Sequence, residues 1–270
     1  MIFFLRKFKN ILFYFGLYSA IFLTLFPLFH IFFFLLKQGL PGLLKTSFFF
    51  SDAVGVGAAG GGMRHAIVGS FYLIGLAALL SLPLGISLGV FLSEYSFVKL
   101  AKITQGFLEM LTGVPSIVVG ILCYLLFKEF HAFAGAVSLS FIMIPILAKS
   151  TQEILRPIGI EVRQAGIALG LSKSQVIFYI LLRGIKGPLI TASIMSIARG
   201  AGETAPLLFT AFGSSFLSLD PTGPMASLPV QIYNYAISPF PEWHEQAWSA
   251  ALFLVLFVLC LNIMGKRKAG

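Results

Sequence analysis

Residues 65–92 read HAIVGSFYLIGLAALLSLPLGISLGVFL and contain no Asp, Glu, Lys or Arg. A helix rises about 1.5 Å per residue and the hydrocarbon core of a bilayer is about 30 Å thick, so this stretch is long enough to cross it. The sequence therefore predicts a membrane-spanning helix at this position.

The composition of the whole chain agrees with a membrane protein. Of its 270 residues, 58% are hydrophobic and only 11% are charged, and the mean hydropathy is +0.94. Soluble domains carry about a quarter charged residues. The chain has too few polar side chains to cover a globular surface, which excludes a soluble enzyme, a disordered tail and a disulfide-rich secreted scaffold.

We predict an all-α integral membrane protein with six transmembrane helices. The apolar runs lie at about 11–36, 65–92, 104–127, 132–149, 187–213 and 247–264. Each run reaches or approaches the length that a bilayer requires, and the fourth and sixth are the shortest. We expect residues 1–270 to form a single transmembrane domain.

The positive charges predict which side of the membrane each loop occupies. With the N-terminus placed in the cytoplasm, 14 of the 19 Lys and Arg residues fall in cytoplasmic segments, 4 fall outside, and Arg199 lies inside a span. Because basic residues favour cytoplasmic loops, we expect both termini, the cluster at 266–268 and the loop 150–186 to be cytoplasmic. The net charge of +9 is then a topology signal and does not indicate a nucleic-acid partner.

The loop 150–186 has the pattern of two short helices joined by a glycine. Residues 161–169 read EVRQAGIAL, followed by Gly170, a residue that commonly ends a helix. Ser172 stands three residues before Gln175, which is a capping-box pattern that opens a second helix. The pattern by itself leaves two interpretations open, a docking surface for a partner and a hairpin that only packs under the bundle.

The same loop resembles the EAA loop of ABC-transporter permeases. The positions that carry the resemblance are Gln164, Ala165, Gly166, Gly170, Ile180 and Leu182. Gln164 replaces the usual Glu, Gly166 replaces the second Ala, and Arg183 replaces the final Pro. The resemblance implies that this loop is a coupling helix that docks in a cleft of a cytoplasmic ATPase. The chain contains no ATP-binding motif, so the ATPase would be a separate subunit.

Arg199 and Glu203 are the full charges that lie well inside a predicted span, in ARGAGETAPLLFTA at 198–211. Their i, i+4 spacing places them on one face of a helix, and each costs about 2.5–3.5 kcal/mol at a helix centre. Gly200 and Gly202 allow close packing of neighbouring helices, and Pro206 predicts a kink because it lacks an N–H. We interpret the pair as part of a substrate path, with a structural ion pair as the alternative.

The chemistry of arginine suggests the charge of the substrate. Its planar guanidinium suits oxyanions such as phosphate or sulfate. Glu203 would hold Arg199 when the path is empty, and an anion could displace it. The residues themselves leave the choice of anion open.

Four segments together resemble the PstA-type permeases of phosphate-specific ABC transporters. They are GGGMRHAIVGS at 60–70, GVPSIVVG at 113–120, ARGAGETAPLLFTA at 198–211 and LPVQIYNYAISPFPEWHEQAW at 228–248. The resemblance covers about residues 60–262 and implies a type I ABC permease-like bundle with its core at about 65–264. It also implies that Arg199 and Glu203 help to move phosphate.

The resemblance further implies a set of partners and a location. We expect a sister permease in a heterodimer, two ATP-binding subunits, a periplasmic or extracellular phosphate-binding protein, and the bacterial cytoplasmic (inner) membrane. The chain itself is expected to be no enzyme and to bind no cofactor, with ATP and Mg on the partner ATPase.

Other function classes remain as alternatives. A permease for sulfate or molybdate is the nearest one, and a stand-alone secondary anion transporter is the next. The secondary transporter would be expected to show inverted repeats or further intramembrane acids, and only Glu109 is a weak candidate. The sequence shows no catalytic set of nucleophile and base, and its four histidines are scattered without metal-ligand spacing.

Overall fold

The computed structural model describes residues 2–55 and 60–267, with side chains from residue 6 onward, and all regular structure in these ranges is helical. Lys268 of the basic C-terminal cluster lies outside the described residues. The elements are α1 (Ile2–Leu43), α2 (Thr46–Phe50), α3 (Arg64–Glu94), α4 (Lys99–Gly113), α5 (Ser116–Phe127), α6 (Ala132–Leu155), α7 (Ile160–Ala168), α8 (Lys173–Gln175), the π-helical segment η1 (Val176–Leu181), α9 (Leu182–Gly184), α10 (Lys186–Ala201), α11 (Ala205–Leu208), α12 (Leu228–Ala236) and α13 (Pro241–Arg267).

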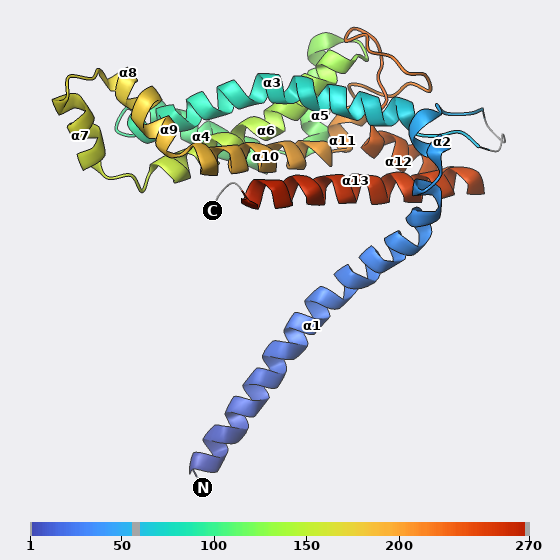
Figure 1. Cartoon of the computed structure of the whole chain (residues 1–270), viewed down its shortest axis with the longest axis horizontal. Helices are drawn as coiled ribbons and strands as arrows, with labels where there is room; N and C mark the ends of the chain where they lie inside the picture. The colour runs from blue at the N-terminus through green and yellow to red at the C-terminus, as the bar shows by residue number, and fades with distance from the viewer. Residues whose placement is uncertain (1, 56–59, 268–270) are drawn as a thin grey trace.

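Four long helices, α3, α6, α10 and α13, lie side by side and form the body of the molecule (Figure 1). Leu73 of α3, Met143 of α6, Leu207 of α11 and Val230 of α12 are buried together at its centre. The short helices α7, α8 and α9 lie at one end of this bundle, and α2 and α12 lie toward the other (Figure 1). The bundle therefore has two distinct ends.

Helices α3 and α6 make the most extensive helix–helix contact, and glycines bring them close together. A Cβ on Gly85 would lie 3.0 Å from Cβ of Leu147, and a Cβ on Gly89 would lie 2.6 Å from the carbonyl oxygen of Ala148. Small residues at such positions let helix backbones approach closely, which is the usual way that helices associate in a membrane. The two helices are therefore packed with little room to slide independently.

The prediction of an all-α membrane protein is confirmed, but two of the six expected spans are bent helix pairs. Helices long and apolar enough to cross a membrane are found at Arg6–Leu43, Arg64–Glu94, Ala132–Leu155 and Pro241–Arg267. The expected span 104–127 is instead α4 and α5, bent by 106° at the break between them. Pro115 explains the break, because it has no N–H to donate and holds Val114 in an extended conformation.

The expected span 187–213 is also divided. Within it the helix α10 ends at Ala201, and the segment before it, Lys173–Gly184, meets α10 at an angle of 76°. A count of six spans holds if each bent pair is one span. The core expected at 65–264 stays a prediction.

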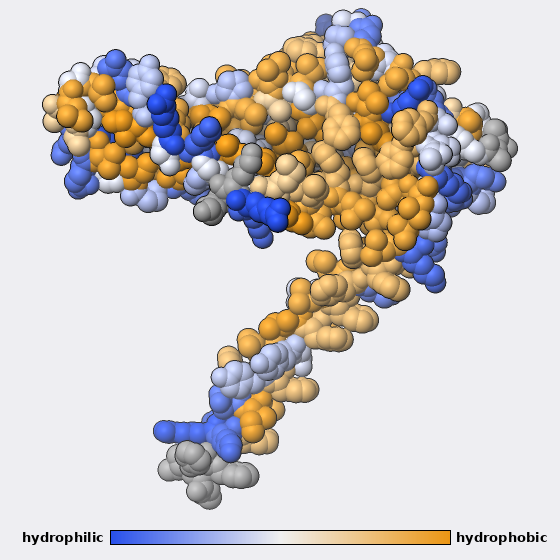
Figure 2. Space-filling view, in the orientation of Figure 1, coloured by the Kyte–Doolittle hydropathy of each residue, from blue (hydrophilic) through white to orange (hydrophobic). Residues whose placement is uncertain are grey.

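Helix α1 leaves the bundle and touches it only near its own C-terminal end (Figure 1). There Gly39 and Gly42 pack on Trp248, Ser249 and Leu252 of α13. Further along α1 the side chains of Phe13, Phe22 and Phe29 are among those exposed, and Figure 2 shows hydrophobic side chains along this helix and over the middle of the bundle. Such an apolar outer surface fits a protein surrounded by lipid or by further membrane helices.

Candidate functional site

Arg199 and Glu203 lie at the point where α10 ends. Arg199 is in the last turn of the helix, Gly202 caps it, and Glu203 follows outside the helix. Nη2 of Arg199 is nevertheless 2.9 Å from Oε1 of Glu203. The prediction that both charges lie on one face of a continuous helix is therefore wrong, although the ion pair itself forms across the helix end.

The two members of this pair differ sharply in exposure. The Glu203 side chain is 10% exposed, whereas the Arg199 side chain is 64% exposed. A buried carboxylate requires a charged or hydrogen-bonding partner. Glu203 thus anchors the pair within the fold, while most of the Arg199 side chain remains open to a further partner.

The structure gives different roles to the three residues expected to shape this helix. A Cβ at Gly200 would lie 2.9 Å from Sδ of Met143, so this glycine does permit close packing on α6. A Cβ at Gly202 would meet only the carbonyl oxygen of Arg199, at 3.8 Å, so the expectation of close packing there is wrong. Pro206 lies in the first turn of α11, where a missing N–H costs little, so it does not kink a continuous helix as expected.

The break between α10 and α11 has a local cause. The amides of Gly202 and Glu203 bond back to the carbonyls of Arg199 and Gly200, which tightens the last turn. Gly202 disfavours continuation of the helix, and Pro206 could not donate to the carbonyl of Gly202 in any case. The chain therefore leaves the helix at the residue that carries the carboxylate.

The segment after the break is held firmly by α5 and α6. A Cβ on Gly120 of α5 would lie 2.6 Å from Cα of Pro206, so α5 packs directly on the start of α11. The hydroxyl of Thr210 donates to the carbonyl of Pro206 at 2.8 Å and lies 3.5 Å from the hydroxyl of buried Ser138. The motifs at 113–120 and 198–211 are thus in contact, which their separate positions in the sequence do not reveal.

The second candidate region is the hairpin formed by α7, α8, η1 and α9, which we call the docking hairpin (residues 160–184). Gly170 has φ of +86°, as its place after a helix predicts. The amide of Leu171 bonds to the carbonyl of Gly166 and the amide of Gly170 to that of Ile167, a Schellman motif. The predicted capping box of Ser172 and Gln175 is also present. Local chemistry thus sets the shape of the turn.

The residues that match the EAA pattern divide between the two sides of α7. Gln164 and Ala165 are exposed, whereas Gly166 is buried. A Cβ on Gly166 would lie 2.8 Å from Cγ2 of Val176 and 3.0 Å from Cδ1 of Ile180, which accounts for a glycine where the pattern has alanine. The exposed apolar side chains of this helix and its end are Ile160, Val162, Ile167 and Leu169. These exposed apolar side chains are available for contact with another protein.

The second half of the docking hairpin departs from the expected α-helix. Val176–Leu181 is a π-helical segment, with Val176, Ile177 and Leu181 buried against Leu155 at the end of α6. Single π-helical turns are rare and occur frequently at functional sites. The second helix expected after Ser172 is therefore present, but with a wider turn than an α-helix.

Comparison with known proteins identifies the family. The family model described as "Binding-protein-dependent transport system inner membrane component" matches residues 81–267. The phosphate transport system permease protein PstA of Haemophilus influenzae is 39% identical over 251 residues, which cover 91% of this chain and 88% of that protein. PstA of Pasteurella multocida is 39% identical over 266 residues, covering 97% and 94%. The chain belongs to the PstA branch of this permease family.

Solved structures support the fold of this permease. It resembles a chain of the inward-facing MetNI methionine ABC transporter with a TM-score of 0.60 at 16% identity, covering 77% of this chain and 95% of that one. An amino acid ABC transporter crystallised with histidines gives a TM-score of 0.53 at 14% identity. The all-helical ABC permease fold expected from the sequence is thereby confirmed. Membership of the family implies ATPase and binding-protein partners for the permease.

Proposed function

We propose that this permease is a transmembrane subunit of an ATP-driven importer of inorganic phosphate. The relatives at 39% identity are named as phosphate transport permeases, and a probable PstA of Methanocaldococcus jannaschii is 32% identical over 264 residues. The observation that carries the proposal is the Arg199–Glu203 pair. Its buried carboxylate orients an arginine whose side chain is 64% exposed, and this leaves forked donors available to a tetrahedral oxyanion.

Arg199 and Glu203 act together in the proposed path. The carboxylate neutralises and positions Arg199 while no substrate is present. An arriving phosphate takes over the guanidinium, because a bidentate contact with phosphate competes well with one open contact to a carboxylate. The rigid support of α11 by Gly120 and Thr210 keeps Glu203 in place during the exchange.

The proposed assembly places this permease beside a sister permease, so that each forms half of the path. Two ATP-binding subunits supply the energy, and the docking hairpin of this chain is the site at which one of them binds. A periplasmic or extracellular phosphate-binding protein delivers the substrate to the opposite end. Neither catalysis nor a bound cofactor is assigned to this chain.

We place the docking hairpin and both termini in the cytoplasm. Basic residues are concentrated in loop 150–186 and at the termini, as the positive-inside rule requires. The hydroxyl of Thr191, near the start of α10, donates to the carbonyl of Gly265 near the end of α13 at 2.7 Å. The hairpin side of α10 and the C-terminal end of α13 therefore lie at the same end of the bundle (Figure 1).

Uptake of radiolabelled phosphate at low concentration tests the proposal. The permease is produced with its sister permease, ATPase and binding protein in cells that lack their own system, and then again without the ATPase. Phosphate uptake that is absent for sulfate and lost without the ATPase is the expected result. Uptake of sulfate or molybdate would assign another oxyanion, and uptake without the ATPase would assign a secondary transporter.

A further inference from the structure

Helix α3 ends in a carboxylate that is enclosed by other elements. Glu94 is the last residue of α3, and its side chain is only 4% exposed. Nε of Arg163, from α7, donates to Oε2 of Glu94 at 2.9 Å, and Nη2 donates to Oε1 at 2.5 Å. This two-pronged contact fixes the direction of the guanidinium as well as its distance. The end of α3 is thus attached to the docking hairpin in one orientation.

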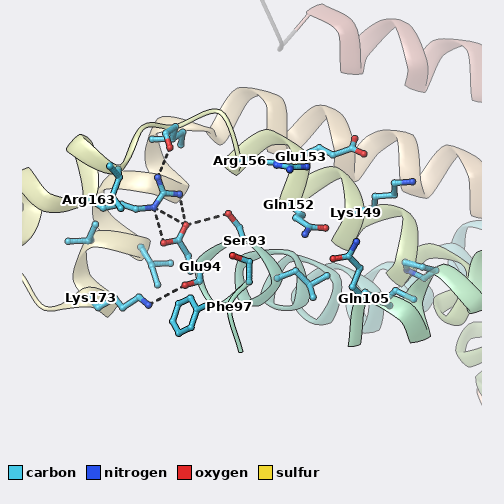
Figure 3. A pocket seen from close by; sticks show the side chains of 18 of the residues that line it. Ser93, Glu94, Phe97, Gln105, Lys149, Gln152, Glu153, Arg156, Arg163 and Lys173 are labelled. Carbon is cyan, nitrogen blue, oxygen red and sulfur yellow. Dashed lines mark hydrogen bonds and ion pairs between the residues drawn. The ribbon is translucent and has the colours of Figure 1, made fainter. Parts of the chain in front are cut away.

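The same guanidinium also reaches the end of α6. Nη1 of Arg163 donates to the carbonyl oxygen of Ile158 at 2.6 Å and to that of Gly159 at 3.2 Å. These carbonyls belong to the connection between α6 and α7, and Gly159 is the residue that caps the start of α7. One arginine therefore joins α3, the end of α6 and α7, as Figure 3 shows for Arg163 and Glu94.

The second half of the docking hairpin also contacts the C-terminal end of α3. Nζ of Lys173, from α8, donates to the backbone carbonyl of Glu94 at 3.3 Å and lies 3.7 Å from the centre of the Tyr95 ring. The first contact satisfies a carbonyl at the C-terminal end of α3, and the second is a cation–π contact. Both arms of the hairpin thus hold α3 at its final residue.

The position of Arg163 in α7 places its contact with Glu94 next to the exposed side of the docking hairpin. Arg163 directly precedes Gln164, whose side chain lies on the exposed side of α7, while Arg163 reaches inward to Glu94. A cavity of about 880 Å³ lies beside the pair, lined among others by Gln105, Glu109, Glu153 and Arg156 (Figure 3). The hairpin therefore borders open space on the side of α4 and α6, and Glu94 is its charged attachment to α3.

A continuous set of contacts runs from α3 to the Arg199 site. The packing of Gly85 and Gly89 on α6 leaves little freedom between α3 and α6. Met143 of α6 then contacts α10, because its carbonyl accepts a hydrogen bond from Ser196 at 3.1 Å and its sulfur packs at Gly200. Gly200 is adjacent to Arg199, so a displacement of α3 and α6 would also move the Arg199–Glu203 ion pair.

We propose that Glu94 and Arg163 form a transmission brace, through which movement of the docked hairpin is passed to α3 and on to the Arg199 site. The proposal rests on the function proposed above, since it needs an ATPase at the hairpin. Both are positioning residues. An apolar pair would give comparable packing energy, whereas a buried bidentate ion pair adds a defined orientation between the two elements.

The test measures phosphate moved per ATP hydrolysed in proteoliposomes that contain the complete transporter with its binding protein. Glu94→Gln removes the charge at constant shape, and we expect this ratio to fall about tenfold, within the range of coupling effects for residues outside both sites. The amount of ATPase that co-purifies should stay at the wild-type level. Arg163→Lys keeps the charge but loses the fork, and we expect an intermediate fall of about threefold.

Glu109→Gln is the matched control. Glu109 lines the same cavity, but its carboxylate accepts a hydrogen bond only from Gln105 of its own helix among the described residues, at 3.0 Å. The phosphate moved per ATP hydrolysed by Glu109→Gln should equal that of wild type. A fall as large as that of Glu94→Gln would overturn the brace, because it would show a general response to charge removal.

The possible negative results can be distinguished from one another. If Glu94→Gln prevents assembly, Arg163→Lys decides the matter, and a wild-type ratio in that variant overturns the brace. Uptake and ATP hydrolysis that fall together at an unchanged ratio would mean a structural role only, and would also overturn it. A wild-type complex without ATP-dependent phosphate uptake would overturn the proposed function itself.

Discussion

Two ion pairs in this permease have the same chemistry and opposite surroundings. In Arg199–Glu203 the arginine is largely exposed, and the pair is closed by a contact of 2.9 Å at a helix end. In Glu94–Arg163 the arginine is 20% exposed, and it donates to both carboxylate oxygens and to backbone carbonyls as well. We call the first the open pair and the second the brace.

The difference in surroundings indicates a difference in use. A pair whose guanidinium keeps donors open can bind another anion through those donors. A pair whose donors are already satisfied by several elements loses all of those contacts when it separates. The open pair therefore suits a site where a ligand arrives and leaves, and the brace suits a mechanical connection.

Removal of the open pair's arginine should have the largest effect. In Arg199→Ala we expect phosphate uptake to fall to less than about one hundredth of wild type, because the loss of a charged contact to a bound partner costs about 3 kcal/mol. Uptake is measured together with the amount of assembled complex. Met195→Ala, an exposed side chain one turn earlier on α10, is the control and should transport normally.

Arg199→Lys tests whether the loss of uptake in Arg199→Ala is only a loss of assembly. The lysine keeps a positive charge beside buried Glu203, so assembly should be normal, but a point charge cannot reproduce the fork. Uptake should remain well below wild type. Wild-type uptake in either Arg199 variant would contradict the assignment of the open pair to the substrate path.

The second largest effect is expected from a substitution at Gly170, in the turn of the docking hairpin. Gly170 has φ of +86°, so Gly170→Val places a β-branched residue in a left-handed conformation at a cost of about 1–2 kcal/mol. We expect the stimulation of the partner ATPase to fall about fivefold to thirtyfold, the factor that corresponds to this cost. Gly170→Asn, which tolerates this conformation, is the control, and unchanged stimulation in Gly170→Val would argue against docking at the hairpin.

Features set by neighbouring residues could be predicted from the sequence, and the two ion pairs show why others could not. The turn at Gly170 and the capping box of Ser172 and Gln175 depend on residues a few positions apart, and both were predicted correctly. The open pair was also found, because two charges in an apolar run stand out. Its geometry was not, since Gly202 ends the helix before Glu203.

The brace could not be predicted from local patterns in the sequence. Glu94 and Arg163 are 69 residues apart in the chain, and nothing local to either one indicates the other. The available signal was the carboxylate that directly ends the apolar run 65–92. Pro115 is a signal for the bend between α4 and α5, because it has no N–H to donate, but it does not decide the matter, since Pro83 lies inside continuous α3 and Pro145 inside continuous α6.

A smaller effect should follow from a change next to the brace that leaves its charges intact. Gly166→Ala restores the residue of the family pattern, but its Cβ would lie 2.8 Å from Cγ2 of Val176. We expect a loss of about 1 kcal/mol in the free energy of unfolding, the low end of overpacking effects. Thermal unfolding of the purified permease measures it, and Val176→Ala in the same chain should recover most of the loss, whereas additive losses would contradict the contact.

The smallest effect is expected at a third ion pair, which is more exposed than the brace and lies at the opposite end of α3. Arg64 donates from Nε to Oδ1 of Asp52 at 3.0 Å, and this hydrogen bond holds the pKa of Asp52 below its ordinary value. A depressed folded-state pKa stabilises the fold above the unfolded pKa of about 3.9, and the contribution is lost as the pH falls through the lower folded value. Asp52→Asn should therefore lower the unfolding temperature by only about 1–2 °C at pH 7, as expected for a partly exposed pair. The difference between variant and wild type should vanish once the pH is below the lowered pKa of Asp52 in the folded state. A difference that persisted there would mean that Asp52 contributes through packing, and would leave the brace as the pair at the ends of α3 in which charge matters.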